Sequence, residues 1–215
     1  MCGRYVSPDT AAIEAQWHIG RRNSTPFPRR FNVAPAAEVP ILHRDEGVLV
    51  LSPARWGLVP YWWRDAKPPR FSHNARLEEA ATRPLWRDAM RRARCLVPAL
   101  GWYEWRAADR QPYFFLRRDE RLVALAGLMA RWTDPATGES LLSCAILTTA
   151  AAGAFAAVHD RMPVTLPDAA AEAAWLESGA THVAADPFTF HPVSRLVNSS
   201  RAEGPELIAP CPQPA

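Results

Sequence analysis

Most apolar residues of the 215-residue chain fall into short runs rich in β-branched and aromatic side chains. The runs are CLVPAL (95–100), GWYEW (101–105), PYFFLRR (112–118), LVALAGLMARW (122–132) and LLSCAILTT (141–149). Runs of this length and composition, bounded by turn residues, are typical of buried strands. A hairpin is predicted earlier in the chain, because PILHR and VLVLSPARW are separated only by Asp45-Glu46-Gly47.

Helical patterns are fewer and shorter than the strand patterns. They cover 9–19, after an N-cap at Ser7 and a first-turn Pro8; Thr82 to Ala93; and Pro167 to Ser178, closed by Gly179. An Ala-rich stretch after residue 150 is expected to form a short helix. Because the strands do not alternate regularly with helices, the sequence predicts an α+β fold with a curved mixed or antiparallel, barrel-like sheet and peripheral helices.

No internal repeat, linker or charge block divides the sequence, so residues 1–209 are expected to form one domain and residues 210–215 a disordered tail. Four cysteines at positions 2, 95, 144 and 211 form no CxxC pair, which favours a reducing compartment and argues against structural zinc. The start resembles no signal peptide, and no apolar run approaches the roughly 20 residues of a membrane span. We therefore expect a cytoplasmic, nucleoid-associated monomer that needs no metal or other cofactor.

The net charge of +3 comes from an unusual set of basic residues, because only Lys67 among the 25 is a lysine. Arginine is well suited to bidentate phosphate contacts. However, a composition rich in Ala, Arg and Pro is also what a GC-rich coding sequence produces. Only arginines that lie inside motifs therefore carry weight for function.

Cys2 is the residue with the most distinctive chemistry. Removal of Met1 would leave an α-amine and a thiol on one residue, with pKa values of about 7.7–8.0 and about 8.5 in the absence of perturbation. The thiol can attack an amide carbonyl with the amine as its base, as in N-terminal-nucleophile glutaminase domains, which also begin with MCG. Alternatively, the amine can condense with an aldehyde and the thiol can close a five-membered thiazolidine. The further asparagine-glycine and arginine motifs of the glutaminases are absent.

Three other polar residues are candidates for proton transfer or orientation. Glu104 lies among aromatic residues in GWYEW, where burial would raise the pKa of its carboxyl, although it can equally be a strand residue that faces water. His159 in VHDRMPV lies in an expected loop beside Arg161, and a structural role is its alternative. Asn74 in HNARLE can orient an amine or a carbonyl, or can simply form a turn.

Seven segments, taken together and in order, resemble the SOS-response-associated peptidase family, whose members are also called abasic-site processing proteins. The segments are MCGR, FNVAP, RWGLVP, NARLE, RCLVPALGWYEW, CAILTT and HDRMPV, and the match runs from residue 2 to about Asn198. The resemblance implies that Cys2, after self-removal of Met1, forms a thiazolidine crosslink with abasic sites in single-stranded DNA.

The resemblance also implies roles for individual residues. Through their motifs, Cys2 matches the nucleophile, Asn74 the residue that positions the amine, and Glu104 the acid/base that helps to open the sugar ring. His159 matches the histidine linked to proton transfer during Schiff-base formation and crosslink reversal. Residues matching the family's DNA contacts are Arg4, Arg76 and Arg161 on the backbone, and Trp62 or Trp63, of which we favour Trp63, on a base.

Three classes of function remain at this stage. They are a covalent abasic-site sensor, which we favour, a Cys2 peptidase or glutaminase with external amide substrates, and a non-covalent single-strand binding module. Zinc-dependent base deamination is excluded, because the sequence holds no HxE paired with PCxxC.

Overall fold

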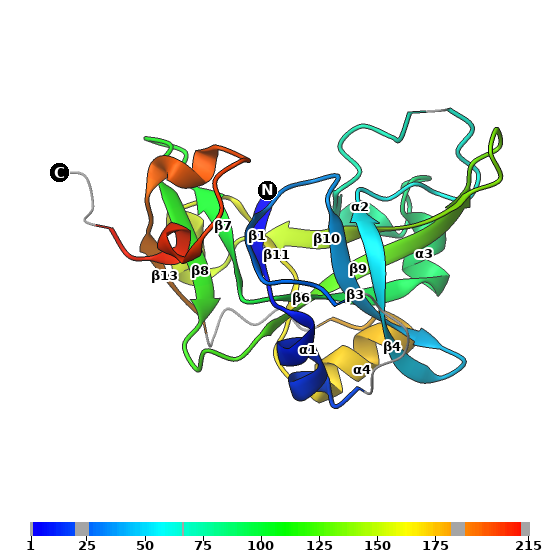
Figure 1. Cartoon of the computed structure of the whole chain (residues 1–215), viewed down its shortest axis with the longest axis horizontal. Coiled ribbons are helices and arrows are strands. Elements are labelled where there is room, and N and C mark those ends of the chain that lie inside the picture. The colour runs from blue at the N-terminus through cyan, green and yellow to red at the C-terminus, as the bar shows by residue number, and fades with distance from the viewer. Residues whose placement is uncertain (1, 20–25, 66, 182–187, 212–215) are drawn as a thin grey trace.

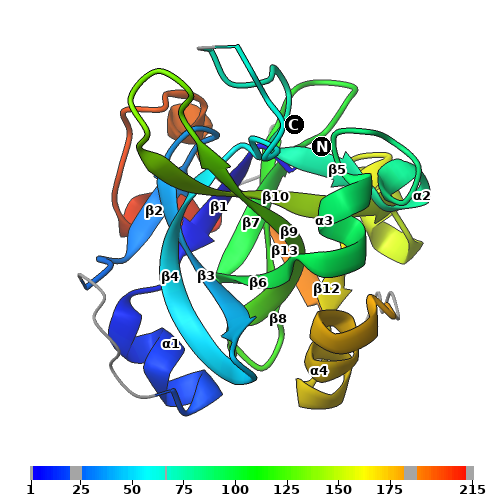
Figure 2. The same ribbon diagram turned by 90° about the vertical axis from the view of Figure 1, so that its right-hand side faces the viewer.

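The computed structural model of the protein describes residues 2–19, 26–65, 67–181 and 188–211. Within these ranges, two β-sheets form the centre of the molecule and helices lie at its periphery (Figures 1 and 2). The strands are β1 (Arg4–Ser7), β2 (Arg30–Val33), β3 (Glu38–Asp45), β4 (Val48–Trp56), β5 (Asn74–Arg76), β6 (Arg94–Ala99), β7 (Gly101–Trp105), β8 (Pro112–Arg117), β9 (Val123–Thr133), β10 (Ser140–Ala150), β11 (Arg161–Pro163), β12 (Thr165–Leu166) and β13 (Phe188–Pro192). The helices are α1 (Thr10–Trp17), α2 (Leu77–Ala80), α3 (Arg87–Arg92) and α4 (Ala169–Ser178), with 3₁₀ helices η1 (Gly153–Ala157), η2 (Arg195–Asn198) and η3 (Pro205–Ile208).

The larger sheet closes on itself to form a barrel. Its strands follow the order β10–β4–β3–β6–β9, and β9 then pairs again with β10. Strands β4 and β5 run parallel to β10, whereas the remaining pairs are antiparallel. Gly127 on β9 allows this closure, because a Cβ atom there would lie only 2.8 Å from Cys95 Sγ on β6. The predicted α+β fold with a curved, mixed, barrel-like sheet is confirmed.

The smaller sheet is antiparallel and has the order β13–β8–β7–β1–β2. Aromatic side chains fill one of its faces, including Trp102 stacked on Phe115 with ring centroids 5.3 Å apart. This aromatic layer is continuous with barrel residues such as Val97 and Ile146, and Cys2 belongs to the same buried cluster. The start of β1 is therefore held between the two sheets.

Several predicted elements are confirmed with small changes at their ends. Glu46 and Gly47 join β3 to β4 with φ angles of 48° and 81°, as a tight hairpin turn requires. Helix α4 ends at Gly179, whose φ is 80°. Helix α1 is also present, but its N-cap is Asp9, which accepts a hydrogen bond from the backbone N–H of Ala12, and not Ser7, which ends β1.

The helix predicted from Thr82 to Ala93 is wrong over its first half. Only α3, Arg87–Arg92, is helical, and turns precede it. Pro84 supplies the reason, because proline has no N–H to donate and disfavours helical geometry at the residue before it. The Ala-rich stretch is η1, a 3₁₀ helix. In the tail, Pro210 bridges to Val193, while residues 212–215 lie outside the described ranges. Across the described ranges, none of the helices is both long and apolar enough to cross a bilayer.

Candidate functional site

Cys2 is fully buried where the two sheets meet. Its Sγ lies 3.9 Å from the carbonyl oxygen of Arg4, a weak hydrogen bond that keeps the thiol beside the first strand. Burial raises the pKa of the thiol far above its usual value, and the nearby carboxylate of Glu104 raises it further. In this arrangement the sulfur therefore carries its proton.

Asn74 holds the backbone of Cys2. Its Nδ2 donates a hydrogen bond of 2.7 Å to the carbonyl oxygen of Cys2. Strand β5 brings the asparagine there by pairing in parallel with β10, where Asn74 lies opposite Ile146. The other side-chain atom, Oδ1, is buried and accepts no hydrogen bond from the described residues. The amide therefore offers an acceptor directly beside Cys2.

Glu104 lies on β7, the neighbour of β1 in the smaller sheet. The register that pairs Arg4 with Tyr103 brings the residues just before β1 alongside this glutamate. Its side chain is almost fully buried, and burial raises the pKa of the carboxyl to about 7. The sequence left open whether Glu104 faces water, and the structure places it in the interior. A carboxyl with this pKa is half protonated at neutral pH, which suits it to give and take protons.

His159 follows η1 and faces the glutamate. Its Nε2 lies 4.0 Å from Glu104 Oε2, while its Nδ1 accepts a hydrogen bond of 3.0 Å from the backbone N–H of Arg161. This places the proton of the neutral ring on Nε2, towards Glu104. Asp160 Oδ1 lies 2.9 Å from Nδ1 and would accept a hydrogen bond from the Nδ1–H group of the charged ring. Burial lowers the pKa of His159, and Asp160 acts in the opposite direction.

Four of the predicted residues therefore converge from different parts of the chain. We call Cys2, Asn74, Glu104 and His159 the reaction cluster. Its members come from the segment before β1, from β5, from β7 and from the loop after η1.

The three predicted arginines occupy different environments. Arg4 Nη1 donates to Asn32 Oδ1 at 2.9 Å and to the carbonyl oxygen of Val197 at 3.1 Å. Arg161 is 14% exposed and forms a bidentate ion pair with Glu78, with N–O distances of 2.8 and 2.9 Å. Arg76, in contrast, is 56% exposed and makes only a 3.4 Å contact with Glu79.

Trp63 lies outside the reaction cluster, in the segment between β4 and β5. Its indole Nε1 donates to the carbonyl oxygen of Lys67 at 2.9 Å, and its own carbonyl accepts a hydrogen bond from Trp132 Nε1. The rings of Trp62 and Trp63 are 5.9 Å apart and tilted by 53°. Both tryptophans therefore remain candidates for contact with a base.

A groove connects these tryptophans with Asn74, and we call it the loop groove. It is lined by Trp62, Trp63, Pro69, Arg70, Phe71, Asn74, Arg76, Glu79, Arg83, Pro84, Leu85 and Trp86. Asn74 belongs to both the loop groove and the reaction cluster, so the groove extends to the residue that hydrogen-bonds the backbone of Cys2.

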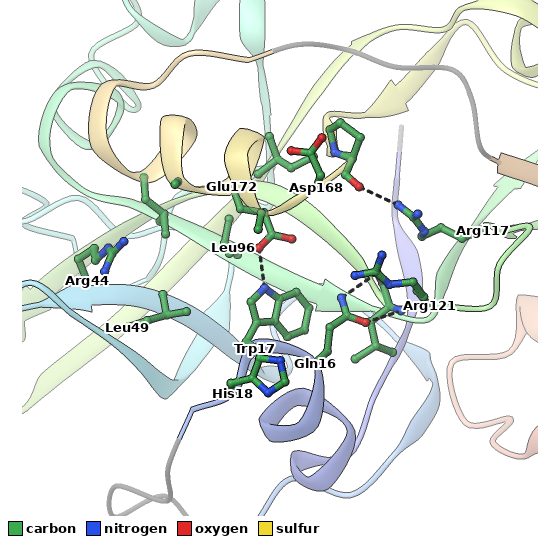
Figure 3. Close-up of a pocket in the computed structure, with 16 residues that line it drawn as sticks. Gln16, Trp17, His18, Arg44, Leu49, Leu96, Arg117, Arg121, Asp168 and Glu172 are labelled. Atoms are coloured by element: carbon green, nitrogen blue, oxygen red, sulfur yellow. Dashed lines mark hydrogen bonds between the residues drawn. The ribbon is translucent and has the colours of Figure 1, made fainter.

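A separate pocket lies between α1 and α4 (Figure 3). Trp17 Nε1 donates to Glu172 across it at 2.7 Å, and Leu96 and Arg121 also line it. None of the predicted site residues lines this pocket. Both overall views place α1 and α4 at the opposite end of the molecule from the β4–β5 segment (Figures 1 and 2).

Three residues near the site were not singled out from the sequence: Glu78, Asp160 and Phe71. Glu78 and Asp160 lie inside the NARLE and HDRMPV segments that carry the resemblance, so their motifs offered a signal. The pairing of Glu78 with Arg161 depends on the approach of α2 to β11, which no local pattern encodes. Within the described ranges, no three His, Cys, Asp or Glu side chains are grouped as metal ligands.

Comparison with known proteins places this chain among several relatives of similar length. It is 36% identical to the abasic site processing protein YedK of Escherichia coli, over 98% of this chain and all of that protein. It is 35% identical to the abasic site processing protein YoqW of Bacillus subtilis, over 97% of this chain and 99% of that protein.

The fold is shared with solved structures. A crystal structure of a protein from Bacteroides thetaiotaomicron superimposes with a TM-score of 0.85 at 21% identity, covering 98% of this chain and all of the other. The family model described as SOS response associated peptidase (SRAP) matches residues 1–200. The chain therefore belongs to the SRAP family.

Proposed function

We propose that this protein processes abasic sites in DNA by capturing the aldehyde of the ring-opened sugar on Cys2. The observation that carries the proposal is the convergence of Asn74 and Glu104 on Cys2, with His159 4.0 Å from Glu104. Two relatives of nearly full-length overlap are named abasic site processing proteins, which supports the same class of substrate. We further propose that the protein acts as a monomer on chromosomal DNA in the cytoplasm, where the crosslink shields the lesion.

The first step is the self-removal of Met1. Hydrolysis of the Met1–Cys2 peptide bond consumes one water molecule, releases methionine and frees the α-amine of Cys2. Asn74 then holds the new terminus at two points. Its Nδ2 remains bonded to the Cys2 carbonyl, and its buried Oδ1 accepts a hydrogen from the amine.

The second step forms a Schiff base. Glu104, with a pKa of about 7, protonates the ring oxygen of the abasic sugar as the C1–O ring bond breaks, and the C1 hydroxyl loses its proton to solvent to become the aldehyde. The Cys2 amine attacks the aldehyde carbon, and the carbinolamine loses water to give the imine. His159, whose Nε2–H faces Glu104, exchanges protons with the departing oxygen and with the carboxyl.

The third step closes the thiazolidine. The sulfur of Cys2 adds to the imine carbon, and the thiol proton passes to the imine nitrogen. No oxidant or reductant is needed, and the net change from aldehyde to thiazolidine is the loss of one water. The buried thiol retains its proton until it reacts, which disfavours unproductive attack on other partners.

The DNA strand is proposed to lie in the loop groove, with its abasic site next to Asn74. Arg76 is exposed there for contact with a phosphate, and Trp62 and Trp63 are available for stacking on a base. A single strand suits this arrangement, because unpaired bases leave their faces free for aromatic side chains.

The test is incubation with a single-stranded oligonucleotide that contains one abasic site, followed by denaturing electrophoresis. We expect a shifted, heat-resistant band, and no band when borohydride has first reduced the aldehyde to an alcohol. Cys211→Ala is the matched control, because Cys211 is partly exposed and lies outside the reaction cluster. Absence of the band together with hydrolysis of peptides or glutamine would favour amide chemistry, and binding without any covalent product would favour a non-covalent module.

A further inference from the structure

Phe71 is an aromatic residue that the fold exposes. Its side chain is 81% exposed, more than Tyr61 at 66% and the other large apolar residues on the described surface. Its backbone φ is +56°, in the left-handed region that a phenylalanine adopts only at a cost. An exposed ring on a strained backbone needs a reason other than packing, and such outliers gather at sites that bind ligands.

The chain after Phe71 is firmly anchored. Ser72 is buried, its carbonyl accepts a hydrogen bond of 2.9 Å from the N–H of Leu58, and its hydroxyl donates to the carbonyl of Pro69. The carbonyl of His73 accepts from Trp56 Nε1 at 2.8 Å and from the N–H of Ile146 at 2.9 Å. Hydrogen bonds therefore hold in place the backbone that follows the ring.

The surroundings of the ring carry positive charge. Phe71 lines the loop groove together with Arg70, Arg76 and Arg83. Glu79 contacts both Arg76 and Arg83 and is the acidic residue of the groove. The groove therefore combines arginines that suit phosphates with an aromatic face that suits a base.

The position of Phe71 relative to Cys2 limits what the ring can contact. Phe71 precedes Asn74 by three positions, so their Cα atoms lie at most about 11 Å apart. Asn74 in turn is bonded to Cys2. A strand whose abasic sugar reaches Cys2 therefore carries its neighbouring nucleotides past the ring.

We propose that Phe71 is a stacking platform for an unpaired base beside the abasic site. The inference rests on the proposed function and adds to it a role for Phe71, which would contact the base of the nucleotide next to the lesion. Stacking of this kind tolerates any base, because each has an aromatic face. The protein would thus position the lesion by binding the intact nucleotide beside it.

The experiment measures binding to two oligonucleotides that carry tetrahydrofuran in place of the abasic sugar. This analogue has no aldehyde, so binding is measured without crosslinking. One oligonucleotide has ordinary bases on both sides of the analogue, and the other carries further analogues there. Phe71→Ala should weaken binding to the first by about tenfold, within the range of roughly 5- to 150-fold for loss of one stacked base. Binding to the second should not change.

Other variants separate stacking from apolar contact and from folding. Phe71→Trp should retain affinity, whereas Phe71→Leu should lose most of it while keeping a similar apolar volume. Val48→Ala is the control, because Val48 is also exposed but lies on the β3–β4 hairpin. Melting temperatures of all variants should match the wild type.

Equal losses for Phe71→Ala on both oligonucleotides, or no loss on either, would overturn the stacking platform. If the wild type crosslinks abasic DNA in that case, the proposed function survives and only the role of Phe71 falls. A wild type that neither binds nor crosslinks would overturn the proposed function itself.

Discussion

The reaction cluster and the loop groove share Asn74 but are built in opposite ways. In the reaction cluster, Cys2, Asn74 and Glu104 are buried, and β-strands hold the last two in place. In the loop groove, Trp63 and Phe71 come from the segment between β4 and β5, where Trp63 is partly exposed and Phe71 is exposed. If the two regions act as proposed, the geometry for chemistry is fixed before substrate arrives, whereas binding depends on side chains at the surface.

The arginines show the same difference between an enclosed and an exposed environment. Arg4 and Arg161 already satisfy much of their hydrogen-bonding capacity with protein acceptors, whereas Arg76 and Arg83 are exposed around Glu79. An arginine held inside a network contributes rigidity, and one at the surface contributes attraction for phosphate. If chemistry and binding separate in this way, substitutions in the two regions should have different effects on crosslinking and on affinity.

The largest effect is expected at Cys2, where both the amine and the thiol must be free. Cys2→Ala and Cys2→Ser retain the amine, so they should form only a Schiff base that borohydride can trap. A variant with a tag that blocks the amine retains the thiol and should give no heat-stable crosslink. All three should bind undamaged single strands nearly as the wild type does, because Cys2 lies outside the loop groove.

Intact mass spectrometry gives a second measurement of the same chemistry. The active protein should lack Met1, and its DNA adduct should have the summed mass less one water. A robust crosslink from the blocked-amine variant would mean that the thiol alone suffices, and the thiazolidine would have to be abandoned.

The next largest effect is expected at the proton-transfer pair. Glu104→Gln keeps the shape of the side chain but cannot donate the proton for ring opening, so crosslinking should slow by about 10²- to 10⁴-fold. In the wild type the acid form declines above pH 7, and the rate at saturating DNA should fall with it. His159→Ala should slow crosslinking or its reversal. Affinity losses as large as the rate losses would instead assign both residues to binding or folding.

Glu104 should also make stability depend on pH. Its pKa is raised in the folded state, so its contribution is fully present below the unfolded pKa near 4.5 and is lost as the pH rises towards about 7. The loss should total about 3 kcal/mol, since each pKa unit corresponds to 1.36 kcal/mol. Urea unfolding at pH 4.5, 6 and 8 should show this decline in the wild type relative to Glu104→Gln. Parallel pH profiles for the two proteins would contradict the burial of an ionisable carboxyl.

The smallest effects are expected for single arginines. If Arg4, Arg76 and Arg161 each contact one phosphate, each alanine variant should lower the log–log salt slope for single strands by about 0.7. Melting temperature should separate the two regions: Arg76→Ala should leave it unchanged, whereas Arg4→Ala and Arg161→Ala lose internal hydrogen bonds. An unchanged slope for all three variants would remove these arginines from the DNA site.

The strands and their curvature could be predicted because each apolar run is local. GWYEW and LVALAGLMARW form β7 and β9 close to the predicted bounds. The closure of the barrel could not be predicted, since it depends on β9 pairing with both β6 and β10. The absence of side chain at Gly127 permits this, but a glycine in a strand pattern has several possible explanations.

The members of the reaction cluster could be named from motifs, but their arrangement could not. The sequence left the environment of Glu104 open, because strand alternation alone does not decide which face of β7 is covered. Pairing of β1 with β7 decides it. Phe71 had no sequence signal, because its exposure results from the anchoring of Ser72 and His73 by residues far along the chain.

The pairing of β1 with β7 also governs when the site can exist during synthesis. Tyr5 lies opposite Val33 on β2 and opposite Trp102 on β7, so the first strand to leave the ribosome lacks its second partner until about 97 further residues have been made. At roughly 5–20 residues per second, that wait is about 5–20 s, and His159 emerges later still. During this interval Cys2 is an ordinary cysteine of a nascent chain, without Glu104 and His159 beside it. If Cys2 acts as proposed, its reactivity towards lesions is a property that the polypeptide acquires only late in its own synthesis.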